Sequence, residues 1–168
     1  GRIRTEATSD GCSPSEGAAF LLLAKAATAR QRGLPALARL AGQALGQEPG
    51  HLYADAPYQG EGLAATLATL LAQAPPPTPI ATVYSSFNGE RYWAREFGVA
   101  RLRSSSAFDP AHAMEHPAEC YGEIGAACGP ALAALAAHGL KHGYRAAPCL
   151  VYASSDRGER AAALLAAA

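Results

Sequence analysis

The stretch GEIGAACGPALAALAA, residues 122–137, repeats a small residue at every fourth position. The repeated positions are Gly125, Gly129, Ala133 and Ala137. On a helix these residues share one face, which is smooth enough for another backbone to approach closely. Leu132, Leu135 and Leu140 add apolar bulk on the other faces. We therefore expect a helix over roughly 123–140 that is buried nearly all round and packed against protein.

The residues just ahead of this helix are polar, and two interpretations of them stay open. The first amides of a helix lack internal partners, and the helix dipole favours negative charge there. Glu123 can serve as that negative group, with Glu119 solvated and His116 satisfied in a loop. Alternatively, the amides and His116 converge on a carbonyl or carboxylate group of a ligand. The residues favour the structural role for Glu119 and leave His116 balanced between the two.

The amino-terminal half of the chain alternates apolar runs with turn residues. Residues 17–24 form a continuous apolar run, typical of a strand buried on both faces, although periodicity alone does not exclude a buried helix. Residues 25–32 are expected to form a helix, and residues 37–46 are ambiguous between helix and strand. Leucines spaced four, three and one apart predict an amphipathic helix over 62–73. The β-branched run 80–84 predicts a strand.

The carboxyl-terminal half continues this alternation. Asn88 is expected to cap a helix over 89–97, with Glu90 in its first turn and Gly98 as its end. Residues 104–121 are expected to form one long, functional loop. Residues 149–154 predict a strand and 155–158 a turn, whereas the alanines of 160–168 favour a helix but leave a returning strand possible. The pattern indicates an α/β layered domain spanning residues 1–168.

Composition excludes several classes of function. The chain has 168 residues and a formal net charge of zero, and no basic stripe suited to nucleic acid follows any segment. We find no apolar run long enough to span a membrane. The cysteines do not form a Cys-x-x-Cys pair, which argues against a zinc site and favours a cytoplasmic protein with reduced thiols. Because the chain begins at Gly1 and its one methionine is Met114, we expect a processed product or a fragment.

Four segments together resemble the carboxyl-terminal half of a β-ketoacyl synthase, a member of the thiolase superfamily. SDGCSPSEGAAFLLLAKAATARQRG (9–33) resembles the family's Gly-Glu-Gly-Ala strand and the helix that follows it. IATVYSSFNGERYWAREFG (80–98) resembles the strand, catalytic loop and helix that end in Phe-Gly. GEIGAACGPALAALAA (122–137) resembles the buried helix opening Gly-His-x-x-Gly-Ala-Ala-Gly, and CLVYASSDRGERAAALL (149–165) the terminal hairpin.

The resemblance implies a thiolase-like half-unit, in which a five-stranded mixed sheet carries helices on both faces. It also implies that residues 160–165 are a strand paired with 149–154, against their helix propensity. In the family two such halves pack together, and the half with the cysteine nucleophile is expected outside this chain. The resemblance thus makes the amino-terminal half of the same synthase a partner, in a homodimer or heterodimer.

The positions that match the family's catalytic residues differ here. Ser86 falls where the family has one histidine, and Gly122, followed by Glu123, falls where it has the other. In the family those histidines hold the thioester oxygen. We expect His116, Asn88 and Glu123, together with Ser86, to form a divergent polar site opposite a nucleophile on the other half. Asn88 remains equally explained as a plain helix cap. Asp156 and Arg157 are expected to pair across a turn, with the mouth of a site as the alternative.

Three functions remain in competition. The first is an acyltransferase of the carbon–carbon condensing type, acting on thioesters of acyl carrier protein or coenzyme A in fatty acid or polyketide synthesis. It would need no metal or redox cofactor. The second is an inactive thiolase-like subunit that shapes a partner's pocket or acts as an assembly surface. The third is a small-molecule binding domain on the same scaffold.

Overall fold

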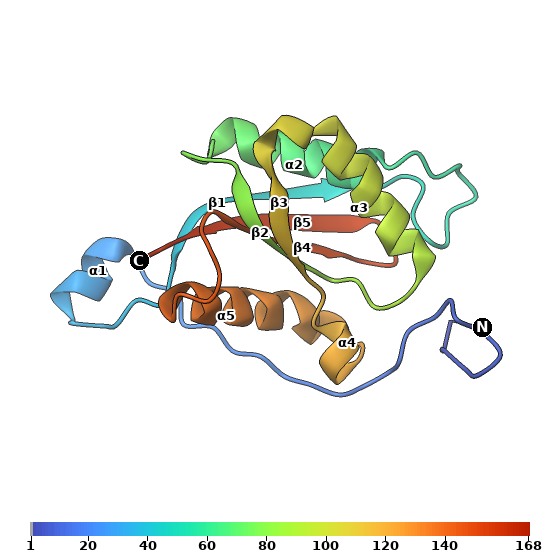
Figure 1. Ribbon diagram of the computed structural model, residues 1–168, viewed down its shortest axis with the longest axis horizontal. Coiled ribbons are helices and arrows are strands. Elements are labelled where there is room, and N and C mark those ends of the chain that lie inside the picture. The colour runs from blue at the N-terminus through green and yellow to red at the C-terminus, as the bar shows by residue number, and fades with distance from the viewer. Residues whose placement is uncertain (1) are drawn as a thin grey trace.

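The computed structural model describes residues 2–168 as one mixed five-stranded sheet with helices on both faces (Figure 1). The strands are β1 (Arg39–Gln47), β2 (Ile80–Ser85), β3 (Phe108–Glu115), β4 (Cys149–Ser154) and β5 (Glu159–Ala166), in the order β1-β5-β4-β2-β3. β2 pairs in parallel with β3 and β4, whereas β5 pairs antiparallel with β4 and β1. The predicted fold class is confirmed.

The two faces of the sheet have separate apolar cores. The helices α2 (Glu61–Gln73) and α3 (Arg91–Arg103) cover one face, and α5 (Cys128–Lys141) covers the other. Because side chains alternate along a strand, Leu150, Tyr152 and Leu164 pack under α2 and α3. Their neighbours Val151 and Leu165 pack against α5 instead. No helix among residues 2–168 is both long and apolar enough to cross a membrane.

The apolar run at 17–24 is not a buried strand. It has no regular secondary structure in this chain, and the exposed fractions of Phe20, Leu22 and Leu23 are 93%, 86% and 75%. The edges of the sheet are formed by β1 and β3, so the run pairs with neither edge of this sheet. The helix predicted next to it forms as α1 (Ala26–Gln31), which has no buried residue.

The ambiguous segment 37–46 is strand β1, and its glycines have a packing role. A Cβ atom at Gly46 would lie 2.1 Å from Thr66 Oγ1 of α2, and one at Gly42 would lie 2.3 Å from Ala74 Cβ. Glycine therefore lets α2 approach the sheet closely at both positions. The helix predicted over 62–73 is confirmed as α2.

The helix predicted over 89–97 begins later and ends later. α3 runs from Arg91 to Arg103, and Gly98 does not end it. Asn88 is not its cap, since its Oδ1 accepts the amide hydrogen of Glu90, the residue immediately before the helix, with N···O 3.1 Å. The first helical amide, that of Arg91, donates instead to the Asp10 carboxylate across 2.9 Å. A residue remote in sequence thus supplies the capping contact.

The segment 104–121 is not one long loop. It contains β3 and the short helix α4 (Ala118–Tyr121), with 3-10 turns η1 (Ser105–Ala107) before them and η2 (Gly125–Ala127) after them. β3 is an edge strand that pairs with β2 alone, a setting in which Pro110 is tolerated. The following helix begins at Cys128 rather than near 123.

α5 is buried on one side rather than all round. Its buried residues are Cys128, Leu132, Ala136 and Gly139, which face the sheet. The repeated small residues lie elsewhere on the helix: Gly125 is exposed, and Gly129, Ala133 and Ala137 are half-buried. The expectation of burial nearly all round is therefore wrong for this chain taken alone. Residues 160–165, helical by propensity, lie in strand β5 (Glu159–Ala166), as the family resemblance implied.

Candidate functional site

Loops at the carboxyl ends of the parallel strands β2 and β4 surround an open cavity of about 990 Å³. After β2 the chain enters α3 on one face of the sheet, and after the neighbouring parallel strand β3 it enters α5 on the other face, so the chain diverges at this edge. In open α/β sheets such a divergence is the usual place for a ligand. Ser86, Asn88 and Glu123 all line the cavity, together with Trp93 and the β4–β5 turn.

Ser86 lies between the ends of the two parallel strands. Its Oγ accepts the amide hydrogen of Ser154, with N···O 3.1 Å, which ties the end of β2 to the end of β4. This contact uses one lone pair and leaves the hydroxyl hydrogen free to be donated elsewhere. Ser86 therefore retains the ability to give one hydrogen bond into the cavity.

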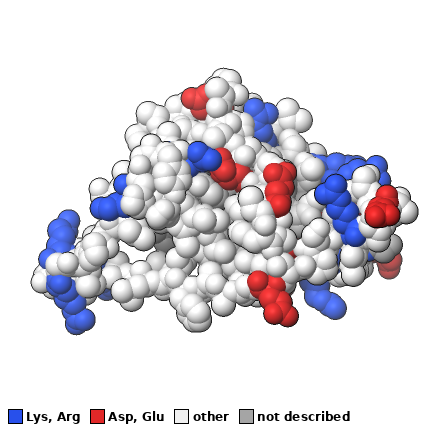
Figure 2. Space-filling view, turned by 60° about the horizontal axis from the view of Figure 1, so that its bottom comes forward, with Lys and Arg blue, Asp and Glu red and all other residues white. Residues whose placement is uncertain are grey.

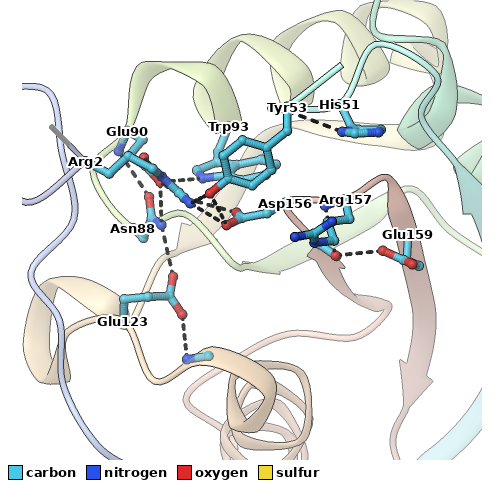
Figure 3. Close-up of polar contacts among 12 residues, drawn as sticks. Arg2, His51, Tyr53, Asn88, Glu90, Trp93, Glu123, Asp156, Arg157 and Glu159 are labelled. Atoms are coloured by element: carbon cyan, nitrogen blue, oxygen red, sulfur yellow. Dashed lines mark hydrogen bonds and ion pairs between the residues drawn. The ribbon is translucent and has the colours of Figure 1, made fainter. Parts of the chain in front are cut away.

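Asn88 and Glu123 are brought into direct contact. Asn88 Nδ2 donates to Glu123 Oε2 across 3.0 Å and to Glu90 Oε2 across 2.9 Å (Figure 3). The other carboxylate oxygen of Glu123 accepts the amide hydrogen of Gly125 at 2.8 Å, just ahead of α5. The amide orientation of Asn88 is determined by this network, because its Oδ1 accepts the Glu90 amide hydrogen. Glu123 thus has both a structural contact and a place in the cavity.

His116 lies in a different cavity. That cavity is about 500 Å³ and is lined by His116, Glu119, Cys120 and the amino-terminal segment; Asn88 borders it as well. The Nε2 atom of His116 pairs with Glu119 Oε1 at 2.6 Å, and its ring lies near that of Phe87. The structure therefore groups Ser86, Asn88 and Glu123, and it places His116 apart from Ser86 and Glu123.

Arg2, Glu90 and Tyr53, which the sequence reasoning did not assign to the site, complete its polar network together with Asp156. Arg2 forms ion pairs with Glu90, at 2.7 Å, and with Asp156 of the β4–β5 turn. Arg2 also donates to the hydroxyl of Tyr53 across 2.8 Å. Asp156 therefore pairs with Arg2 rather than with Arg157, and both turn residues line the larger cavity, which is the alternative expected for them. Nothing in the sequence near Arg2 distinguishes it, since its partners lie 88 and 154 residues away.

The charges of the network set the protonation of Glu90. The hydrogen bonds from Arg2 are the main cause that lowers the pKa of the Glu90 carboxyl, with further contributions from Asn88 and Trp93. Burial acts in the opposite direction and is outweighed. Glu90 is therefore ionised at neutral pH, and Arg2 neutralises it. The Glu123 carboxylate has no such ion pair with a Lys, Arg or His side chain among residues 2–168.

A buried ion pair lies next to the polar network of the site. Arg160 Nε donates to Glu96 Oε1 across 2.6 Å, and the two side chains are 0% and 1% exposed. Glu96 also accepts from the hydroxyl of Ser154. The indole of Trp93 packs over Arg160 and donates to Glu90 Oε2 across 3.0 Å. Trp93 therefore connects this pair to the polar network.

Three of the four cysteines are not placed as activated nucleophiles. Cys12, Cys128 and Cys149 are buried, and burial raises the thiol pKa of Cys128 to about 11 and of Cys149 to about 12. Burial also raises the thiol pKa of Cys12. Cys120 is exposed and lines the smaller cavity. Residues 2–168 also contain no group of three or more His, Cys, Asp or Glu side chains placed to hold a metal ion.

Several ketosynthases are among the solved structures to which this chain is similar. AntDE:AntF, described as a type II PKS acyl-carrier protein in complex with its ketosynthase bound to the hexaketide, matches with TM-score 0.72 and 16% identity, over 86% of this chain and 42% of that one. Ketosynthase twelve from the bacillaene polyketide synthase in Bacillus amyloliquefaciens matches with TM-score 0.71 and 16% identity, over 86% and 32% of the two chains. The ishigamide ketosynthase/chain length factor matches with TM-score 0.69 and 16% identity, over 85% and 41%.

The shared fold is that of a thiolase-like half-unit. This chain spans 32% to 42% of the length of those three ketosynthase chains. No protein-family model and no curated protein matches its sequence. The resemblance to the carboxyl-terminal half of a β-ketoacyl synthase is thus confirmed at the level of the fold.

Proposed function

We propose that residues 1–168 form the carboxyl-terminal half of a 3-oxoacyl-ACP synthase-type acyltransferase, of the carbon–carbon condensing kind. Its substrates are thioesters of acyl carrier protein or coenzyme A, and its place is the cytoplasm, in fatty acid or polyketide synthesis. One observation carries the proposal. In a fold shared with ketosynthases, Ser86, Asn88 and Glu123 line one cavity at the carboxyl ends of the parallel strands.

Each of the three residues has a separate role in this proposal. The Ser86 hydroxyl donates to the thioester oxygen, which becomes negative as the carbonyl is attacked. The Glu123 carboxylate accepts the proton that the acceptor carbon loses. That carbon attacks the acyl carbonyl, so the new carbon–carbon bond forms while the bond between the acyl group and the nucleophile of the second half breaks and frees that nucleophile. Asn88 acts on Glu123 rather than on the substrate, because its amide hydrogens already contact Glu90 and Glu123. The acyl group arrives on a nucleophile of the second half.

The second half-unit is proposed to cover the α5 side of this chain. The side of α5 that faces away from the sheet is half-buried to exposed. The apolar run 17–24 is also exposed, and it does not pair with an edge strand of the sheet. Most of the surface in Figure 2 is uncharged. Burial of apolar surface is the main driving force of association, so such a surface suits a protein partner. The assembly is either a homodimer or a heterodimer.

The test combines labelling with substitution in the complete protein. It is incubated with an acyl thioester, and intact mass spectrometry detects an acyl-enzyme adduct before a second thioester is added as acceptor. We expect Glu123→Gln to leave adduct formation intact and to lower condensation roughly a hundredfold or more, the usual contribution of a general base. Ser86→Ala is expected to slow both steps. Condensation by Glu123→Gln at the rate of the unaltered protein would contradict the proposed role.

His116 provides the matched comparison. Since its Nε2 is held by Glu119 and it lies in the smaller cavity, His116→Ala is expected to change turnover less than Glu123→Gln does. A loss of turnover as large as that caused by Glu123→Gln would show that His116 takes part in catalysis.

A second candidate is an inactive subunit that shapes a partner's pocket. It is favoured by the buried, high-pKa thiols, because none of those three provides a reactive thiolate. The two candidates differ in one readout. An inactive subunit forms no adduct and no product under any pairing of thioesters, yet its Glu123→Gln and Ser86→Ala variants alter the chain length made by its partner.

A further inference from the structure

Arg2 is fully occupied by contacts within the site. Its Nε and Nη2 atoms donate to the two oxygens of Glu90, each across 2.7 Å. Nη1 and Nη2 donate to the two oxygens of Asp156, and Nη1 also donates to the hydroxyl of Tyr53. A guanidinium has five N–H donors in a fixed fork, and all five are used here. A lysine ammonium, with three donors at one point, cannot reproduce this set.

The contacts continue from Arg2 into the cavity without a break. Glu90 Oε2 accepts from Asn88 Nδ2, and the same nitrogen donates to Glu123 Oε2 (Figure 3). Arg2 is therefore two residues removed from the carboxylate that faces the cavity. Each residue in this series of contacts is oriented by the one before it. The Asn88 amide cannot rotate without losing a hydrogen bond to one of the two carboxylates or to the backbone amide of Glu90.

Charge explains why the chain of contacts needs Arg2. Glu90 and Glu123 are two carboxylates that share one amide nitrogen, and like charges this close repel. Arg2 neutralises Glu90 and leaves Glu123 as the member without a cationic partner among residues 2–168. Removal of Arg2 would leave both carboxylates uncompensated around Asn88, and the pair would relax by moving apart or by taking up a proton.

We propose that Arg2 is a positioning residue of the site: through Glu90 it holds the amide of Asn88, and through Asn88 it holds the carboxylate of Glu123. The amino-terminal segment that carries Arg2 thus completes a site whose other members come from the loops after β1, β2, β4 and α4. The catalytic meaning of this inference rests on the proposed function, whereas the positioning itself is measurable without any activity.

The chain's one asparagine gives a direct probe. Labelling with [¹⁵N]asparagine gives a single side-chain amide, that of Asn88, in the NMR spectrum. In the unaltered chain its two hydrogens should resonate away from free-amide values and exchange slowly with water. Arg2→Met is expected to move both signals toward free-amide values and to speed exchange at least about tenfold. Arg2→Lys, which keeps the charge and loses the fork, should fall between the two.

A matched variant separates positioning from mere attachment of the segment. Arg91 pairs with Asp10 across 2.8 Å and so anchors the same segment at a second point, although its side chain is 82% exposed. Arg91→Met is expected to leave the Asn88 amide unchanged. The inference is overturned if Arg2→Met leaves the amide signals in place, or if Arg91→Met moves them equally. Far-UV circular dichroism establishes that each variant is folded.

A kinetic arm links this inference to the proposed function. If the complete protein condenses acyl thioesters, Arg2→Lys should lower kcat roughly tenfold to a hundredfold with a smaller change in KM, because orientation rather than binding is lost. If the protein shows no transfer at all, the proposed function fails, and the NMR result still decides whether Arg2 orients Asn88.

Discussion

At the scale of the residue, Asn88 is the point where structure and chemistry meet. Its expected role as a helix cap is taken over by Asp10, and its side chain instead joins Glu90 to Glu123. An asparagine amide is suited to this place because one nitrogen donates to two carboxylates while the oxygen accepts a backbone hydrogen. No charged side chain of similar size offers donors and an acceptor together.

We therefore expect Asn88→Asp to be destabilising in a pH-dependent way. The new carboxylate would oppose Glu90 and Glu123, which would raise its pKa in the folded state above its unfolded value. The variant should lose about 1–3 kcal/mol of unfolding free energy at pH 7 and recover part of it as the pH falls below about 5. Urea denaturation at both pH values measures the change.

The control for this substitution makes the same amide-to-carboxylate change on an exposed strand position, Gln43→Glu. That variant should stay within about 0.5 kcal/mol of the unaltered chain at both pH values. Equal losses in the two variants would show that Asn88 is not part of a charged network.

At the scale of the element, close approach matters more than intrinsic propensity. Half of the residues of β5 are alanine, a helix-favouring residue, yet the strand lies between β1 and β4 with ladder partners on both sides. Gly42 and Gly46 weaken β1 as an isolated strand and at the same time let α2 pack on it. The same logic applies to Gly122, where a Cβ atom would lie 2.6 Å from the carbonyl oxygen of Ser13.

Gly122→Ala is accordingly expected to loosen the amino-terminal segment. Gly122 has φ of +80°, so alanine would be strained there and would also push against the segment's backbone. Gly143→Ala, at φ +75° with open space around it, carries the backbone strain alone. We expect a loss of about 1 kcal/mol for Gly143→Ala and about twice that or more for Gly122→Ala.

Two measurements check this pair of variants. Urea denaturation gives the difference in unfolding free energy, and trypsin cleavage after Arg4 should be faster in Gly122→Ala alone. Identical cleavage of the two variants would mean that the segment does not depend on the close contact at Gly122.

At the scale of the whole molecule, the chain has two unlike sides. The α2 and α3 side is closed by its own core, whereas the α5 side leaves half the helix and the run 17–24 uncovered. A buried strand was expected over 17–24 because its sequence is continuously apolar. The run has the apolar composition of a buried segment, but its side chains are exposed in this chain. This combination supports the proposal that a second half-unit covers it.

The double substitution Phe20→Ser and Leu22→Ser is expected to weaken association without lowering stability. Full burial of each side chain contributes about 1.5–3 kcal/mol, so losing both should raise the dissociation constant at least about a hundredfold. Sedimentation equilibrium of the chain together with its second half-unit measures this dissociation constant. Leu102→Ser serves as control, because Leu102 is 71% exposed on α3, on the opposite face of the sheet. A dissociation constant that responds equally to Leu102→Ser would exclude a specific role for residues 17–24.

The sequence by itself determined the α/β class, α2, β2, β4 and the turn after β4, because periodicity and turn chemistry are local properties. The family resemblance added the five-stranded sheet and the strand character of β5. It also selected Ser86, Asn88 and Glu123, which the structure places around one cavity. Local signals failed at Gly98 and over 104–121, where open space around a glycine and pairing at a sheet edge decide the outcome.

Only the tertiary structure decided which charges meet. Arg2 reaches Asp156 across 154 positions of sequence, and His116 turns to Glu119 rather than to the cavity that holds Glu123. The small residues at every fourth position likewise do not show which side of α5 faces the sheet. Small residues permit close packing equally well against the chain's own sheet and against another half-unit. The physical reason is the same in each case: an ion pair or a packed face depends on separation in space, which the order of residues does not contain.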